Sequence, residues 1–239
     1  MALDLTADAL LSTVSPTTNT AADTSAPSLR SLAGSQTLTG LEVRLSRVFI
    51  KDNHTARVGP FPGRANLYLL VAVTDGRPLT DDQVTLTGFP GINDQEELLI
   101  DRTVYFWEPG PTAETAPSQV HVLVSVLKSK QRLRDTGTLL TQAQASAPYQ
   151  SLAARLAGGA LTVAGQAPNL LLRLGSEVAK LLTEAEDKTL LTQVTSFTDL
   201  NGDFDALGHT DHAQENGSVA TTLTLIVRDA GRSPAVASS

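Results

Sequence analysis

One run of residues near the middle of the chain limits its fold more than any other feature. Val120 to Leu127 has valine at every second position, and alternate side chains of a β-strand point to the same face. The run therefore predicts a strand with one uniformly apolar face. Apolar patterning and turn residues predict further strands over 41–50, 65–74, 84–87, 98–107, 189–197 and 219–227.

Two segments between these strands have a helical period instead. The apolar residues of 149–156 and 170–182 recur at helical spacing, and Pro148 and Pro168 lie close to their starts. Strands and helices do not alternate along the chain. The pattern therefore predicts a mainly β fold, an antiparallel β-sandwich with a two-helix insertion at about 139–186, before the last two strands. We expect both helices to pack on the sandwich, with partner docking and membrane-surface binding as alternatives.

The two ends of the chain differ in composition from the middle. Residues 1–37 are rich in Thr, Ser and Ala, and residues 231–239 are similar. Such segments bury too little apolar surface to order themselves, so we expect flexible arms that become ordered on a partner. One sandwich domain is predicted over 38–230.

The composition excludes several classes of function. The net charge of −7 and the pI of about 5.0 argue against a nucleic-acid partner, which requires a basic surface. The chain has no cysteine, which excludes disulfide scaffolds, Cys-ligated zinc and thiol nucleophiles.

The N-terminal sequence bears on localisation. It begins Met1-Ala2-Leu3-Asp4-Leu5, with no early basic residue and no apolar region of the kind that secretory signals contain. The apolar run from Leu67 to Val73 is too short to span a bilayer, which takes about 20 residues. We expect a soluble protein, made in the cytosol without a signal peptide, that can be incorporated into a larger particle.

Metal-ligand side chains are concentrated in the stretch from Asp199 to Glu215. Carboxylate and amide groups alternate there as in the opening of a calcium loop, at Asp199, Asn201, Asp203 and Asp205. A complete loop needs Gly at its sixth position and Glu at its twelfth, but the chain has Phe204 and Thr210 there. We therefore predict a polar connection between the last two strands and no cofactor. If calcium or another cation binds, these four residues are its expected ligands.

The four histidines give no clear metal site. His209 and His212 are three residues apart, a spacing that brings ligands together on a helix, but their surroundings have no helical period. We expect both to be surface residues. His54 and His121 are expected to be ordinary surface or strand-face residues.

A basic strip follows the valine-rich strand. Its four cations alternate with other residues, so that on an extended chain they would share one face: Lys128, Lys130, Arg132 and Arg134. This arrangement suits phosphate, a lipid headgroup or an acidic partner. The alternative is a solvated hairpin end.

No catalytic signature is complete. Asp135-Thr136-Gly137-Thr138 matches the aspartic-protease triplet, but Arg134 stands where an apolar residue would bury the carboxylate. The phosphate-binding Gly-rich loop, His-Glu-x-x-His and Gly-x-Ser-x-Gly are absent from the sequence. We therefore expect a protein that is not an enzyme.

The order of segments resembles the C2-domain type of β-sandwich over about 38–140 and 187–230. Three segments carry the resemblance: the first strand up to Asp52 with its Gly59-Pro60-Phe61-Pro62 loop, the strand from Asn66, and Val122 to Gly137. The resemblance implies apical loops that bind calcium through aspartates and dock on phospholipid. Asp52 matches one such position, whereas Asn66 stands where an Asp is expected.

These observations favour a structural or interaction subunit of a protein assembly, such as a virion, a tail-like particle or a surface layer. A homo- or hetero-oligomer is expected. The first alternative is a C2-like adaptor that binds membrane phospholipid or an acidic partner through its apical loops. The second is a hydrolase whose site geometry the sequence does not reveal.

Overall fold

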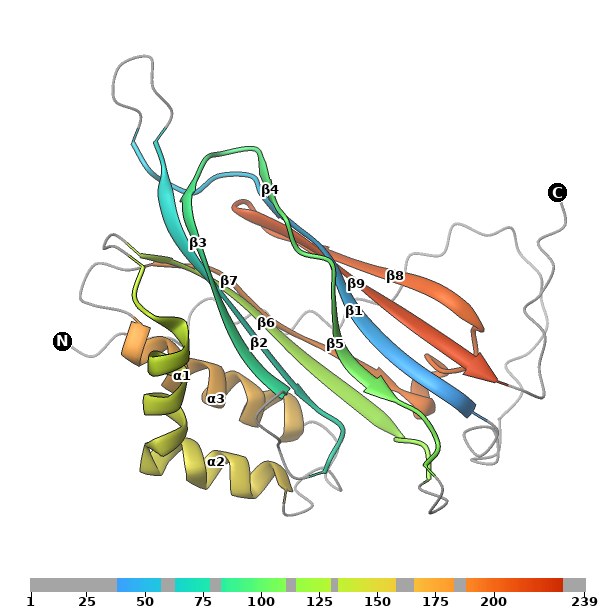
Figure 1. The fold of residues 1–239 in the computed structure, drawn as a ribbon. Helices are drawn as coiled ribbons and strands as arrows, with labels where there is room; N and C mark the ends of the chain where they lie inside the picture. Colours follow the sequence, from blue (N-terminus) through green and yellow to red (C-terminus); the bar gives the residue numbers. More distant parts are fainter. Residues whose placement is uncertain are drawn as a thin grey trace, which may run out of the picture.

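The computed structural model describes residues 38–56, 63–77, 83–110, 115–129, 133–157, 166–182 and 188–229. The elements are β1 Leu38–Ile50, β2 Ala65–Thr74, β3 Val84–Ile92, β4 Glu96–Leu98, β5 Arg102–Trp107, β6 Gln119–Ser129, α1 Thr136–Ala145, α2 Ala147–Ala157, α3 Gln166–Leu182, β7 Lys188–Thr198, β8 Gly208–Glu215 and β9 Val219–Asp229. They form two packed antiparallel sheets with the helices on one side (Figure 1). The β-sandwich expected from the sequence is confirmed.

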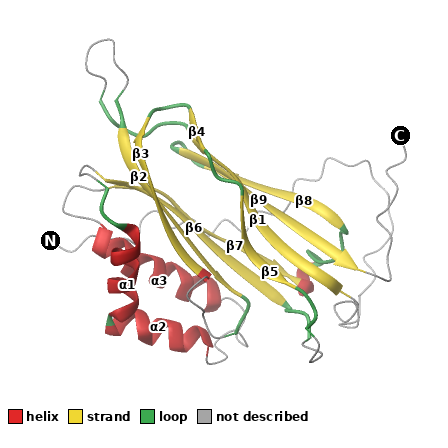
Figure 2. Ribbon diagram, in the orientation of Figure 1, coloured by secondary structure: helices red, strands yellow, loops and turns green. Residues whose placement is uncertain are grey.

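One sheet has the strand order β4-β1-β9-β8, with β5 also paired to β1. We call it the open sheet, because no described helix lies on its outer face (Figure 2). β1 and β9 pair along almost their whole length, from Leu38 with Asp229 to Ile50 with Val219. Strands that are far apart in the sequence therefore form the centre of this sheet.

The second sheet has the order β3-β2-β6-β7, and all three helices lie on its outer face (Figure 2). We call it the covered sheet. Helix α3 packs against β6, β7 and β2, α1 packs against β3, and α2 packs against α3. Gly175 allows the close approach of α3, because a Cβ at this position would lie 2.5 Å from Cδ2 of Leu123.

The covered sheet separates two apolar cores. In β2, Leu67, Leu69, Val71 and Val73 point into the sandwich, while Tyr68, Leu70 and Ala72 face the helices. Both sets are buried, which explains why the sequence of this strand is almost continuously apolar. The valines of β6 line the sandwich core, as their spacing predicts, and Leu123 and Leu127 face α3.

The helical insertion has three helices instead of the two expected. The additional helix, α1, begins after Asp135, whose carboxylate accepts hydrogen bonds from the backbone N–H groups of Gly137 and Thr138. This is the geometry of a helix N-cap. The triplet that matches a protease motif is therefore the start of a helix, and its carboxylate accepts the capping hydrogen bonds.

The C-terminal part of the sandwich has three strands instead of two. β8 lies within the stretch expected to be a polar connection, and it pairs with β9 without a register shift. The strand expected over 98–107 is divided into β4 and β5 by residues 99–101. The two arms, 1–37 and 231–239, lie outside the described residues.

Candidate functional site at the loop end of the sandwich

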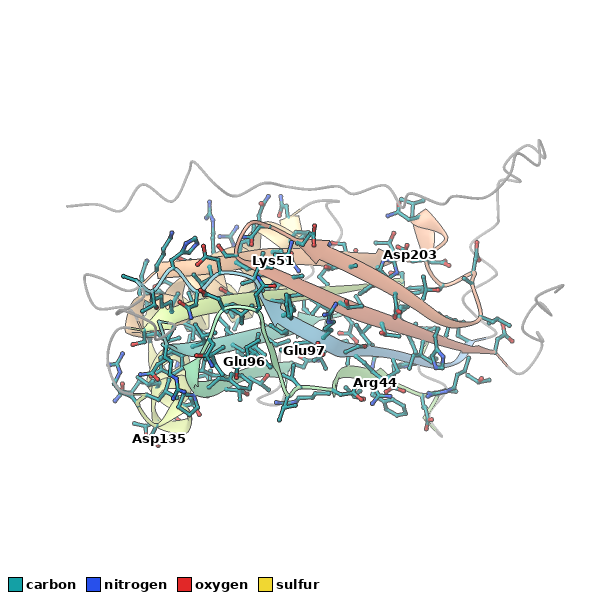
Figure 3. The ribbon with its side chains drawn as sticks, turned by 90° about the horizontal axis from the view of Figure 1, so that it is seen from above. Arg44, Lys51, Glu96, Glu97, Asp135 and Asp203 are labelled. Atoms are coloured by element: carbon teal, nitrogen blue, oxygen red, sulfur yellow. The ribbon has the colours of Figure 1, made fainter. Side chains whose placement is uncertain are left out.

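Several connecting segments meet at one end of the sandwich, which we call the loop end. They are residues 51–56 after β1, 93–95 between β3 and β4, the β8–β9 turn at 216–218, and the last residues of β6. The pairing brings them together, because Ile50 is opposite both Val219 and Glu96. Figure 3 shows Lys51 and Glu96 in this region, with Asp203 towards the opposite end of the sheet.

Asn53 ties these segments together. It is fully buried, and its side-chain amide donates to the carbonyls of Gly63 and Ile92 at 3.0 and 2.9 Å. Its backbone N–H donates to Asp94 Oδ1 at 2.8 Å, and its Oδ1 accepts from the N–H of Thr55 at 2.8 Å. A buried amide with this many partners holds the surrounding backbone in one arrangement.

His54 links β1 to the β8–β9 turn. Its Nε2 lies 2.7 Å from Ser218 Oγ, and its Nδ1 lies 3.3 Å from Asp52 Oδ2. Its backbone has φ of 54°, a left-handed conformation that is uncommon for residues other than glycine. The N–H of His54 donates to Asp52 Oδ1, and its carbonyl accepts from Lys128 Nζ at 2.9 Å. These contacts hold the ring between a carboxylate and a hydroxyl.

This Asp–His–Ser chain has the order of groups that general-base catalysis uses. A histidine placed in this way can take the proton of a serine hydroxyl as the hydroxyl attacks an acyl carbon. Ser218 is only 8% exposed, however, and its carbonyl accepts the backbone N–H groups of Lys51 and Asp52. The same contacts fasten the end of β1 to the hairpin turn.

A second left-handed residue lies at the same end. Gln95 has φ of 58°, and its side chain donates to the carbonyl of Lys51 at 2.7 Å. Glu96 accepts from both the backbone and the side chain of Asn93. Among the described residues, the non-glycine positions with positive φ are His54 and Gln95, and strained backbone of this kind is concentrated at functional sites.

The two positions that resemble calcium ligands of C2 domains also lie at the loop end, but both make contacts within the protein. Asp52 is hydrogen-bonded to His54, and Asn66 Oδ1 accepts from the N–H of Gly91 at 3.1 Å. Within the described part of the chain, no three His, Asp or Glu side chains form a group that could hold a metal.

The structure describes two of the four residues of the basic strip. Lys128 ends in a hydrogen bond to the carbonyl of His54 and is buried. Arg134 donates through Nη2 to the carbonyl of Leu182 at 3.0 Å and through its backbone N–H to the Tyr68 hydroxyl. These two cations therefore serve to join segments of the fold. Lys130 and Arg132 lie outside the described residues.

The acidic stretch lies partly in the connection at the opposite end and partly in β8. Asp199 and Asn201 belong to a single 3-10 turn, and Asp203 Oδ2 accepts from the N–H of Thr198 at 2.7 Å. The buried side chain of Phe204 belongs to the sandwich core. The candidate ligands Asp203 and Asp205 thus flank a core residue in a closed turn.

The two histidines of this stretch lie on opposite faces of β8. Residues three apart on a strand point in opposite directions, and His209 is exposed whereas His212 points inward. The His212 ring meets Phe197 edge-on at 4.9 Å. Burial lowers the pKa of His212, although the charges of Asp203 and Asp211 act in the opposite direction. The expectation of two surface histidines is wrong for His212.

His121 lies on a strand face of β6, one of the two places expected for it, and it is buried there. It is 4% exposed on the helix side of β6, with Nδ1 2.8 Å from Ser196 Oγ, and burial lowers its pKa to about 4. Both faces of β6 are buried, which the valine spacing alone does not predict. A histidine there must be buried whichever way it points.

A surface hollow between α2 and α3 is lined by Pro148, Ser151, Leu152, Arg173, Ser176, Glu177 and Lys180. The Glu177 carboxylate of this hollow is bound by Lys180, whose Nζ lies 2.6 Å from Glu177 Oε1. The charge of Glu177 is therefore balanced by Lys180 within the same helix.

Comparison with known proteins adds little. No protein-family model and no curated protein matches the chain. A solved structure described as Drosophila C2-DSL-EGF1 is similar over 79% of this chain and 67% of that chain, with 8% sequence identity and a TM-score of 0.31. A likeness at this score carries no argument about fold or function.

None of the helices described here is long and apolar enough to cross a membrane.

Proposed function

We propose that this protein is a non-enzymatic structural or interaction subunit of a protein assembly, such as a virion, a tail-like particle or a surface layer. The observation that carries the proposal is the difference between the two sheets. Helices bury the outer face of one sheet, whereas no described element covers the outer face of the other (Figure 1). A free sheet face is a surface that a partner can cover.

The outer face of the open sheet is ordered by its own hydrogen bonds. Glu42 accepts from Thr103 Oγ1 at 2.7 Å and from Arg228 Nη2 at 2.8 Å. Burial alone would raise the pKa of Glu42, but these hydrogen bonds and the charges of Arg228 and Arg44 lower it overall. The carboxylate is therefore ionised and fixed, which prepares this face for binding because few side chains would need to be ordered.

Aromatic and arginine side chains lie on the same face. Phe106 is 53% exposed, and the guanidinium of Arg47 lies 5.1 Å from the ring centre of Phe49. Aromatic residues and arginine are enriched in protein interfaces, where they supply most of the binding energy.

The test measures the mass of the full chain over a wide concentration range by light scattering after size exclusion. We expect oligomers, and we expect Phe106→Arg to weaken them. Arg173→Glu, on the exposed side of α3, is the control and should leave them unchanged. A wild-type chain that is monomeric at every concentration, and that retains no partner from its source, would contradict the proposal.

A second candidate function is hydrolysis, which the Asp52–His54–Ser218 chain favours. In this reading His54 takes the proton of Ser218 Oγ as the oxygen attacks an ester carbonyl, and gives it to the alcohol that leaves when the ester C–O bond breaks. Water then cleaves the acyl group from Ser218 as a carboxylic acid. The test is labelling of the full chain by a fluorophosphonate, with Ser218→Ala as the control. Labelling of the wild type alone would support the function, and no labelling would exclude a serine nucleophile at this site.

The relation to C2 domains, and the adaptor function that it implies, is likewise a proposal. The loop end would then be the surface that meets an anionic membrane or acidic partner. Replacing Lys130 and Arg132 by Glu tests this without disturbing the Lys128 contact. Loss of sedimentation with phosphatidylserine vesicles at low salt would support the adaptor, and wild-type protein that never sediments would exclude it.

A further inference from the structure

Among the described strands, β8 forms one edge of the open sheet. This strand has eight residues, pairs only with β9 among the described strands, and does so without a bulge. Its side chains alternate regularly between partly buried and exposed positions. A strand at a sheet edge presents unpaired N–H and C=O groups, so that a regular edge of this length can accept another strand.

The other edges are less suitable for pairing. On the opposite side of the open sheet, β4 and β5 are short and separate, and the β1–β5 register shifts at Val43. β3 contains Pro90, which has no N–H to donate, and it has a register shift against β2.

Side chains of neighbouring segments already form hydrogen bonds with the backbone of the edge strand β7. The side chain of Asn216 donates to the carbonyl of Leu190 at 2.8 Å, and Asp203 makes hydrogen bonds to both the N–H and the carbonyl of Thr198. Both ends of β7 are therefore occupied, which leaves β8 as the most regular open edge.

We propose that β8 pairs antiparallel with β8 of a second copy about a two-fold axis at His212, so that His209 of each copy lies opposite Glu215 of the other. This inference rests on the proposed assembly function and specifies one of its contacts. The arrangement continues the open sheet across two copies, and the interface is formed by the same surface on both.

Charge determines this register. Residues directly opposite in an antiparallel pair share a face, so the exposed positions His209, Asp211, Ala213 and Glu215 must be matched among themselves. With His212 on the axis, His209 meets Glu215 twice and Asp211 meets Ala213 twice. An imidazole can donate a hydrogen bond to a carboxylate in either protonation state, so both outer pairs are favourable.

The neighbouring registers bring like charges together. A shift of the partner by two residues in one direction places Asp211 opposite Asp211, and a shift in the other direction places Asp211 opposite Glu215. Like charges directly opposite destabilise a strand pair. On the inner face the proposed register brings the two copies of His212 together, and the lowered pKa of His212 keeps them uncharged.

The absence of cysteine from the chain makes a direct test simple. Two full-length variants are made, Asp211→Cys and Ala213→Cys, one of them carrying a tag that changes its mass. Directly opposite residues have Cα atoms about 4.5–5.5 Å apart, within the range that a disulfide can span. We expect mild oxidation of the mixture to form a disulfide-linked dimer of the two different variants. Neither variant alone should form a disulfide-linked dimer.

The outcomes separate the registers. Self-joining of Asp211→Cys or of Ala213→Cys would show a shifted register and overturn the proposed one. In case one variant fails to fold, the experiment is repeated with His209→Cys mixed with Glu215→Cys. If neither mixture gives a disulfide-linked dimer, the β8 edge contact is overturned. If the wild-type chain still forms oligomers, only the proposed β8 contact is disproved. If the wild-type chain is monomeric, the proposed assembly function is disproved as well.

A charge exchange gives a second readout. Glu215→Lys should raise the dimer dissociation constant about tenfold, and adding His209→Glu should restore it by reversing both pairs. Glu97→Lys is a matched control, because Glu97 is on β4 of the same sheet and, like Glu215, forms a salt bridge on the surface. An equal effect of both Lys substitutions would overturn the assignment of the contact to β8.

Discussion

The covered sheet is apolar on both faces, whereas the open sheet is apolar on its inner face and carries a polar network on its outer face. In β6 every residue from Val120 to Ser129 is buried, but in β9 buried and partly exposed residues alternate from Val219 to Thr224. The two central strands thus differ in what surrounds them. The covered sheet packs on both faces, whereas none of the described helices covers the outer face of the open sheet.

The largest effect should come from the packing between β6 and α3. Leu123→Ala removes a fully buried side chain, and we expect the free energy of unfolding to fall by about 3 kcal/mol. Because Gly175 faces Leu123, adding Gly175→Ala should recover part of this loss in the double variant. Urea unfolding measures both. A loss below about 1 kcal/mol would show that the helices contribute little to the covered sheet.

Acid should weaken the same sheet. The pKa of His121 is about 4 in the folded protein and about 6.5 in an unfolded chain, so that only the unfolded chain gains the proton between these values. The stability contributed by the neutral ring is complete above pH 6.5 and declines as the pH falls towards 4. Linkage gives a loss of about 2 kcal/mol between pH 8 and pH 5 from this group, and His212 adds to it in the same direction.

Comparison of variants identifies the source of this loss. His121→Asn should reduce the pH dependence of the urea midpoint, because it removes the buried imidazole whose pKa the fold lowers. Equal pH dependence in the wild type and in His121→Asn would contradict the assignment.

The network on the open sheet should have a smaller effect. Glu42→Gln removes the charge that Arg228 and Arg44 contact, and we expect a loss of about 1 kcal/mol at pH 7, because both guanidinium groups are partly exposed. The pKa of Glu42 is lowered in the fold, so this contribution is present above about pH 4.5 and is lost as the pH falls below it. A difference between variant and wild type that does not shrink as the pH falls from 5 to 3 would show that the shape of the side chain matters there, and not its charge.

The smallest effect on stability is expected at an exposed aromatic of the open sheet. Phe106→Ser should change the free energy of unfolding by less than about 0.5 kcal/mol, since the ring is half exposed. It should nevertheless weaken assembly. A large loss of stability would mean that the outer face is part of the core, which would remove the distinction between the sheets.

The difference between the two sheets also explains which strands could be predicted from the sequence and which could not. β2 and β6 are recognisable because both of their faces are buried, which gives β2 an almost continuous apolar run and β6 its valines at every second position. β8 is missed because it is an edge strand of mostly polar residues on both faces, so that neither its period nor its composition differs from that of a loop. Its partner β9 alternates clearly and is predicted almost to its ends.

The sequence fails to predict α1 and the contacts at the loop end for other reasons. In α1 a short polar helix starts at a cap whose residues also match a protease triplet, and a local motif cannot distinguish the two. The Asp52–His54–Ser218 chain joins residues 164 positions apart, and only the β1–β9 pairing brings them together. No sequence spacing could have shown it.

The pairing of β1 with β9 also has a consequence for how the chain folds as it is synthesised. Glu42 and its partner Arg228 are 186 positions apart, so that β1 emerges from the ribosome long before β9, although β4 and β5 on its other side follow soon after it. β2, β3, β6, the helices and β7 can meet one another during this interval, whereas one edge of β1 still lacks its partner strand. Closure of such a long loop is slow. The nascent chain is therefore most exposed to misassociation just before β9 appears, and this is when a chaperone would have most effect.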